Sequence, residues 1–187
     1  DASVALPEVK LGLLPGGGGT QRLPRLIGVE KALDWIVSGK TVKAKAALEA
    51  GVLDAVFDGD LVANAVAFAA QLDKATAPRS TGKLTVKVPD NAAELFDKAR
   101  DNARKTARGM DAPLQCIACV EESTRNTLED GLTFERARFL ELVNGTQSKA
   151  IRHLFFAERE AAKPPRDALD AELRKVQRVG VIGAGTM

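Results

Sequence analysis

Apolar residues recur at helical spacing along most of this chain. Leu33, Ile36 and Val37 predict a helix that begins near Thr20 and ends at Gly39, because one face of a helix repeats every three to four residues. A second helix is expected to start at 41–43, run to 50 and stop at a glycine. The same periodicity predicts further helices over 60–72, 91–108, 113–128, 131–144, 146–162 and 167–175.

Strand patterns are fewer and shorter. Residues 2–9 suggest a strand with Pro7 at its edge or end. Residues 52–57 and 179–182 are rich in β-branched side chains and predict a second and a third strand. No internal repeat or low-complexity tract is present. The expected fold class is therefore mostly α with a few short strands.

The most distinctive chemistry is a glycine-rich stretch close to a carboxylate. Glu8 precedes Pro15-Gly16-Gly17-Gly18-Gly19-Thr20, which leads into a predicted helix. Backbone N–H groups at a helix start can orient a water molecule or an oxyanion, and a nearby glutamate can hold or deprotonate that water. No Gly-Lys-Ser/Thr follows, so the phosphate-binding P-loop pattern is absent. From spacing alone, a tight strand-to-helix turn with a surface glutamate is the simpler interpretation of the stretch.

Composition narrows the function classes. With 27 Lys+Arg against 25 Asp+Glu, 4% aromatic residues and no tyrosine, the chain lacks the basic and stacking surfaces of a nucleic-acid binder. No apolar run reaches the roughly 18–20 residues of a membrane span, and no signal peptide is evident. We therefore expect a cytoplasmic protein. Cys116 and Cys119 share a predicted helix face and are expected to be buried, and His153 has no metal-ligating partner at usable spacing.

The segment from Leu6 to Leu23 resembles the crotonase (enoyl-CoA hydratase/isomerase) superfamily. It matches that family's Pro-Glu-x-x-x-Gly-x-x-Pro-Gly-x-Gly-Gly-Thr-Gln-Arg-Leu segment, and the likeness extends through residues 1–160. The resemblance implies an acyl-CoA thioester substrate. It also implies that Glu8 is the second of two catalytic glutamates flanking the reacting water, and that Gly16 supplies a backbone N–H to hold it. The first glutamate and both oxyanion donors would lie upstream of this chain, which is therefore expected to be an inactive fragment.

The end of the chain resembles the opening of a dinucleotide-binding domain. A hydrophobic strand runs into Gly183-Ala184-Gly185, without the third glycine, the helix or the acidic residue of the full fingerprint. A crotonase domain, a proline-containing linker and then this strand is the order found in bifunctional enoyl-CoA hydratase/3-hydroxyacyl-CoA dehydrogenases of fatty-acid β-oxidation. That likeness implies NAD as the cofactor of the larger protein, near Gly183, Gly185 and Met187, and no NAD bound to this chain alone. The implied domains are 1–57 (end of the crotonase core), 58–162 (helical region), 163–177 (linker) and 178–187 (first dehydrogenase strand).

Other features remain open between two interpretations. Glu158 resembles a position that bifunctional relatives use near the substrate, but a solvated helix charge explains it as well. Arg22, Arg25 and Lys40 could meet CoA phosphates, although ordinary surface charge is the simpler interpretation. The resemblance also suggests a homo-oligomer and a possible thiolase partner. The alternatives are an enoyl-CoA isomerase of the same superfamily, or a helical interaction or assembly module without an active site.

Overall fold

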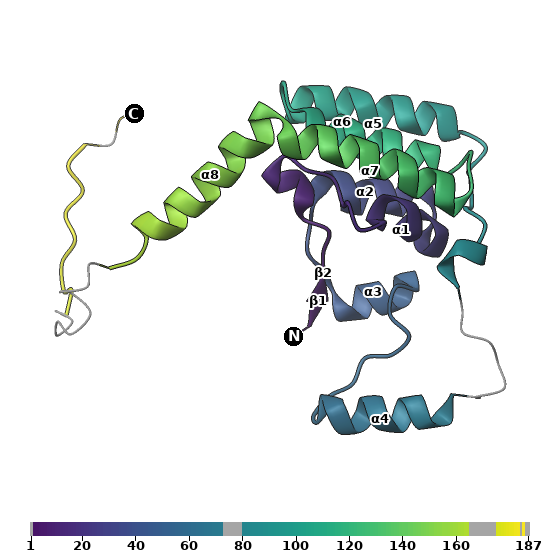
Figure 1. Ribbon diagram of the computed structural model, residues 1–187. Coiled ribbons are helices and arrows are strands. Elements are labelled where there is room, and N and C mark those ends of the chain that lie inside the picture. Colours follow the sequence, from purple (N-terminus) through teal and green to yellow (C-terminus); the bar gives the residue numbers. More distant parts are fainter. Residues whose placement is uncertain (1, 73–79, 165–174, 184, 186–187) are drawn as a thin grey trace.

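The chain, seen here as a computed structural model, is mostly helical (Figure 1), which confirms the expected fold class. The structure describes residues 2–72, 80–164, 175–183 and 185. Their elements in chain order are β1 (Ser3–Val4), the short 3-10 helix η1 (Glu8–Leu11), α1 (Gly19–Ile27), α2 (Val29–Ser38), β2 (Val42–Lys43), α3 (Ala44–Ala50), α4 (Leu61–Gln71), η2 (Thr81–Lys83), α5 (Ala92–Thr106), α6 (Asp111–Glu122), α7 (Leu128–Asn144) and α8 (Thr146–Ala161).

Helix α6 lies at the centre of the fold. It packs against α1, α2, α5 and α7, and α1 also packs against α7 (Figure 1). Ile117 and Val120 on α6, Ile36 on α2 and Leu14 before α1 are completely buried. Burial of each such side chain contributes about 1.5–3 kcal/mol to stability. Helices α1 and α2, before η2, and α5, α6 and α7, after it, thus share one apolar core with Leu13 and Leu14 beside the glycine-rich stretch.

The helix predicted from Thr20 to Gly39 is two helices. Gly28 separates α1 from α2 with φ +81° and ψ 166°, a conformation that cannot continue an α-helix and that glycine adopts without steric strain. The predicted end at Gly39 is correct, since this residue is left-handed and donates its N–H to the Trp35 carbonyl.

Strands are shorter than the sequence suggested. Of residues 2–9, only Ser3 and Val4 are extended in a ladder, paired antiparallel with Lys43 and Val42 of β2. The strand predicted over 52–57 is wrong, because this stretch has no ladder partner among the described residues and its Val56 is exposed. β-branched residues raise strand propensity, but a strand forms only where another strand supplies hydrogen bonds.

Two helices leave large apolar surfaces uncovered by the described residues. None of the residues of α4 is buried, and Leu61, Val62 and Val66 are exposed. Figure 1 shows α4 set apart from the helical bundle, and it shows α8 projecting away from the bundle beyond its first turns. On α8, Leu154 and Phe156 are likewise exposed.

Candidate functional site

Glu8 lies at the first position of η1, immediately after Pro7. Its backbone carbonyl accepts a hydrogen bond from the Leu13 N–H at 3.1 Å, which folds the chain back toward the glycine-rich stretch. The Oε2 atom of its side chain is shielded from solvent and has no hydrogen-bond partner among the described residues. An ionisable oxygen in that situation is uncommon, because burial without a donor costs free energy. Glu8 is therefore half-buried, with one shielded carboxylate oxygen, and not the fully exposed glutamate of the simpler interpretation.

The glycine-rich turn packs directly on α7. A Cβ on Gly16 would lie 2.5 Å from Cδ2 of the Phe139 ring, so only glycine fits between the turn and this helix. Gly18 is left-handed, with φ +90°, and caps the start of α1. The Arg22 guanidinium donates to the Gly17 carbonyl at 2.9 Å and closes the outer side of the turn.

A second buried carboxylate, not singled out from the sequence, lies against this turn. Glu135 on α7 is 1% exposed. Its Oε1 accepts a hydrogen bond from the Gly18 N–H at 2.6 Å, and its Oε2 accepts from the Thr20 N–H at 3.1 Å and from the Thr20 hydroxyl at 2.5 Å. The interpretation that these N–H groups are exposed for a water or an oxyanion therefore needs correction. Among the glycine-rich residues, Gly16 keeps the proposed role, which stays a prediction.

The Glu135 network continues into α6. Gln21, fully buried, donates from Nε2 to the Thr20 hydroxyl at 3.1 Å and to the Cys119 carbonyl at 2.7 Å. Burial raises the pKa of Glu135, although the hydrogen bonds from Thr20 and Gly18 and the charge of Arg22 act in the opposite direction. No sequence signal marks Glu135 as different from the other acidic residues of α7; only its i, i+4 spacing from Phe139 places both on one helix face.

The two cysteines are buried, as predicted, and unpaired. Burial raises the pKa of the Cys116 thiol, and the charges of Cys119, Glu8 and Glu135 add to the effect. Burial likewise raises the pKa of Cys119 to about 12, with Glu135 the next contributor. Cys116 therefore lies within the electrostatic field of both carboxylates, Glu8 on one element and Glu135 on another.

The remaining predicted site residues are not brought to Glu8. Glu158 is exposed on α8, seven residues or about 10 Å of helix beyond Ile151, whose Cδ1 borders Gly12. Residues 175–183 form neither helix nor strand, so the strand at 179–182 stays a prediction. Gly183 and Gly185 are exposed, and a Cβ at either position would meet no atom within 4 Å, so they form no cradle that fits NAD. Met187 lies outside the described residues.

The basic residues fall into two groups. Arg25 is buried, contrary to the expectation of surface charge, and donates to the Gln21 carbonyl at 2.7 Å and the Asn126 carbonyl at 3.2 Å. Arg22 and Lys40 line an apolar hollow of about 210 Å³ between β1, α1 and α2, together with Leu23 and Trp35. Lys40 also forms an exposed ion pair with Asp34, which contributes little to stability.

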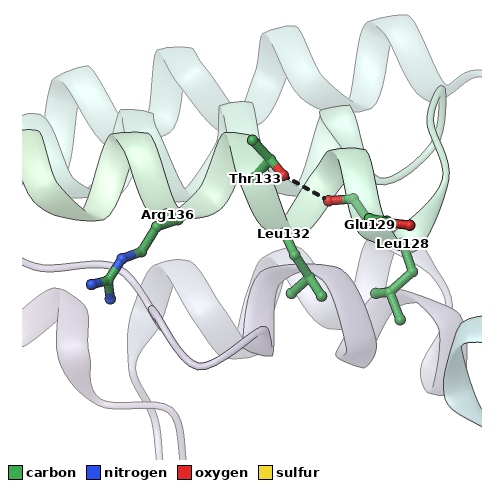
Figure 2. Close-up of a pocket in the computed structure, with 5 residues that line it drawn as sticks. All are labelled: Leu128, Glu129, Leu132, Thr133 and Arg136. Atoms are coloured by element: carbon green, nitrogen blue, oxygen red, sulfur yellow. Dashed lines mark hydrogen bonds between the residues drawn. The ribbon is translucent and has the colours of Figure 1, made fainter.

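A wider surface hollow of about 480 Å³ lies along α7 (Figure 2). It is lined by Leu128, Glu129, Leu132, Thr133 and Arg136, and Figure 2 shows the Thr133 hydroxyl donating to the Glu129 carbonyl, at 3.1 Å. None of the predicted site residues lines it. Over the described part of the chain, no group of three or more His, Cys, Asp or Glu is placed to hold a metal, and no helix is long and apolar enough to cross a membrane.

Comparison with known proteins finds a family match for the segment that contains Glu8 and the glycine-rich turn. The family described as enoyl-CoA hydratase/isomerase matches residues 1–88. The chain is 41% identical over 192 residues to the peroxisomal bifunctional enzyme of Cavia porcellus and 40% identical over 192 residues to that of Homo sapiens, in both cases with 100% of the chain aligned. It is 40% identical over 194 residues to the fatty acid oxidation complex subunit alpha of Shewanella amazonensis, with 98% aligned.

These alignments cover 26% or 27% of each relative, so the chain spans about a quarter of the length of the curated relatives it matches. The match at residues 1–88 includes both Glu8 and the turn that packs on α7. Through those residues, positions 1–88 of this chain match the enoyl-CoA hydratase/isomerase family.

Proposed function

We propose that this chain is part of a fatty-acid oxidation enzyme that adds water to trans-2-enoyl-CoA thioesters. The whole enzyme then oxidises the resulting 3-hydroxyacyl-CoA with NAD in a further domain. The support is the similarity to bifunctional enzymes and fatty acid oxidation subunits over almost the whole chain. CoA thioesters would be the substrates, and a homo-oligomer or a complex with a thiolase would be the assembly.

The observation that carries this proposal is the Oε2 atom of Glu8, which is shielded from solvent and lacks a donor among the described residues. In the proposed reaction, a water molecule donates a hydrogen bond to the Glu8 carboxylate and the Gly16 N–H helps to hold its oxygen. Glu8 then takes the proton as the water oxygen bonds to C3 of the enoyl thioester. The first glutamate of the family resemblance, which would supply the proton that C2 takes up, and the oxyanion donors would come from residues outside this chain.

Replacement of Glu8 in the full-length protein tests this role. Glu8→Gln keeps the side-chain shape but removes the base, so hydration of crotonyl-CoA should fall by about a hundredfold or more. Oxidation of ready-made 3-hydroxyacyl-CoA should be retained. Glu30→Gln is the matched control, because Glu30 is exposed at the start of α2. Equal loss of both activities in Glu8→Gln would point to a folding defect and leave Glu8 without its assigned role.

The 187-residue chain by itself should neither hydrate crotonyl-CoA nor reduce NAD with 3-hydroxyacyl-CoA. It holds one of the two carboxylates that the reaction requires, and Gly183 and Gly185 form no nucleotide site. Turnover of either substrate well above a no-protein control would contradict this division of the machinery.

A double-bond isomerase is the second candidate, because the matched family includes isomerases by its description. A 3-enoyl-CoA substrate distinguishes the two: conversion to the 2-enoyl product without hydration would favour the isomerase. The cytoplasmic location stays a prediction, since two of the relatives are named as peroxisomal.

A further inference from the structure

We infer that Glu135 is a positioning residue for the proposed hydration, holding the glycine-rich turn in the conformation that presents the Gly16 N–H to the reacting water. The inference rests on the proposed function. Glu135 itself does not touch the substrate in this scheme; it acts through the backbone of Gly18 and Thr20.

The carboxylate of Glu135 binds the turn at three points. The donors are the Gly18 N–H at 2.6 Å, the Thr20 N–H at 3.1 Å and the Thr20 hydroxyl at 2.5 Å. The side chain is 1% exposed, so water does not compete for these bonds. Both backbone donors lie at the start of α1, where N–H groups have no partner within the helix and where the helix dipole favours a negative charge.

The same face of α7 holds the turn at two other places. Leu132, three residues before Glu135, has its Cδ2 2.9 Å from where a Cβ of Gly18 would be. Phe139, four residues after Glu135, leaves no space for a Cβ on Gly16. These three residues recur at i, i+3 and i+7, so one stripe of α7 contacts the turn from Gly16 to Thr20. Leu132 and Phe139 pack against the turn, and Glu135 forms the hydrogen bonds that orient it.

The three hydrogen bonds to Gly18 and Thr20 require a carboxylate rather than an amide at position 135. It accepts on both oxygens, whereas a glutamine amide accepts on one and donates on the other. A glutamine at position 135 would therefore turn an N–H donor toward either Gly18 or Thr20 and leave a backbone N–H without its acceptor. Gly16 lies two residues before Gly18, so a shift of the released turn is transmitted to the N–H proposed to hold the water.

The test compares Glu135→Gln with wild type in the full-length protein. We expect kcat for crotonyl-CoA hydration to fall by about ten- to a hundredfold, the scale of a displacement of about 1 Å in a catalytic group, with KM changed less than about twofold. Oxidation of 3-hydroxyacyl-CoA should be unchanged. Glu129→Gln, on an exposed position of the same helix, is the matched control and should leave both activities at wild-type values.

A second variant and a second measurement keep the inference open to refutation if Glu135→Gln does not fold. Thr20→Val removes the hydroxyl donor and retains the backbone one, so it should lower kcat in the same direction by a smaller factor. Hydrogen–deuterium exchange of the peptide that contains Gly18 and Thr20 should be faster in both variants, while exchange in α6 stays as in wild type.

The outcomes separate the two proposals. Unchanged kcat in an enzyme that hydrates crotonyl-CoA, or unchanged exchange at Gly18 and Thr20, overturns the role of Glu135 and leaves the proposed function intact. Equal loss of hydration and oxidation would assign Glu135 a purely structural role and also overturn the inference. A wild-type enzyme without hydratase activity overturns the proposed function, and with it the catalytic part of the inference.

Discussion

Gly131 of α7 packs directly against the side-chain amide of Gln21 of α1. A Cβ built on Gly131 would overlap Gln21 Oε1 and lie 2.8 Å from its Cδ. Gln21 cannot readily move away, because its Nε2 is hydrogen-bonded to the Thr20 hydroxyl and to the Cys119 carbonyl. The absence of a side chain at Gly131 therefore sets the close approach of α1 and α7, and with it the position of the glycine-rich turn.

Gly131→Ala should accordingly destabilise the protein, by about 1–3 kcal/mol, the usual cost of overpacking a core. Chemical denaturation with urea measures the change in the free energy of unfolding. Gly17→Ala is the control, since a Cβ there would meet no atom within 4 Å. Equal stability of Gly131→Ala and wild type would show that the two helices separate without cost.

Cys116 and Cys119 should be unreactive in the native protein. Both are fully buried, and burial raises the pKa of each thiol, so the reactive thiolate is scarce at neutral pH. Modification by a thiol reagent at about pH 8 should be at least about a hundredfold slower than in denaturant, because reaction requires the protein to open. Rapid labelling of either cysteine under native conditions would contradict the packing of α6 described above.

The stability contributed by Glu135 should depend on pH. Because burial raises its pKa in the folded state above the unfolded value, the folded state binds the proton more tightly. Stability from this group is therefore fully present below the unfolded pKa of about 4.3 and is lost as pH rises through the raised folded value. The difference in unfolding free energy between wild type and Glu135→Gln should therefore shrink as pH rises above the unfolded value of about 4.3. A difference that stays flat over this range would contradict the assigned pKa shift, with Glu129→Gln as the control for loss of a surface carboxylate on α7.

The chain by itself should associate in solution. Leu61, Val62 and Val66 on α4, and Leu154 and Phe156 on α8, are exposed apolar side chains on two helices, and extended apolar surfaces of this kind usually become covered. Light scattering at tens of micromolar protein should show dimers or larger species. A monomer at that concentration would favour a self-sufficient helical module.

Most of the helices, and the chemistry of one segment, follow from the amino-acid order alone. Apolar spacing located α4–α8, and glycines marked several ends, including that of α3, because helix periodicity and left-handed caps are local properties. The spacing of Glu8 and the glycine-rich stretch likewise carries the family resemblance without any tertiary contact.

Which polar groups meet depends instead on how the helices pack. Glu135 and Gly18 are separated by 117 residues, and Gln21 and Cys119 by 98, so no local pattern links either pair. The failed strand at 52–57 has the same origin, since a ladder requires a partner that local propensity does not supply. In the same way, Gly131 was expected at a helix boundary but lies inside α7, because its small size serves the contact with Gln21 rather than a turn.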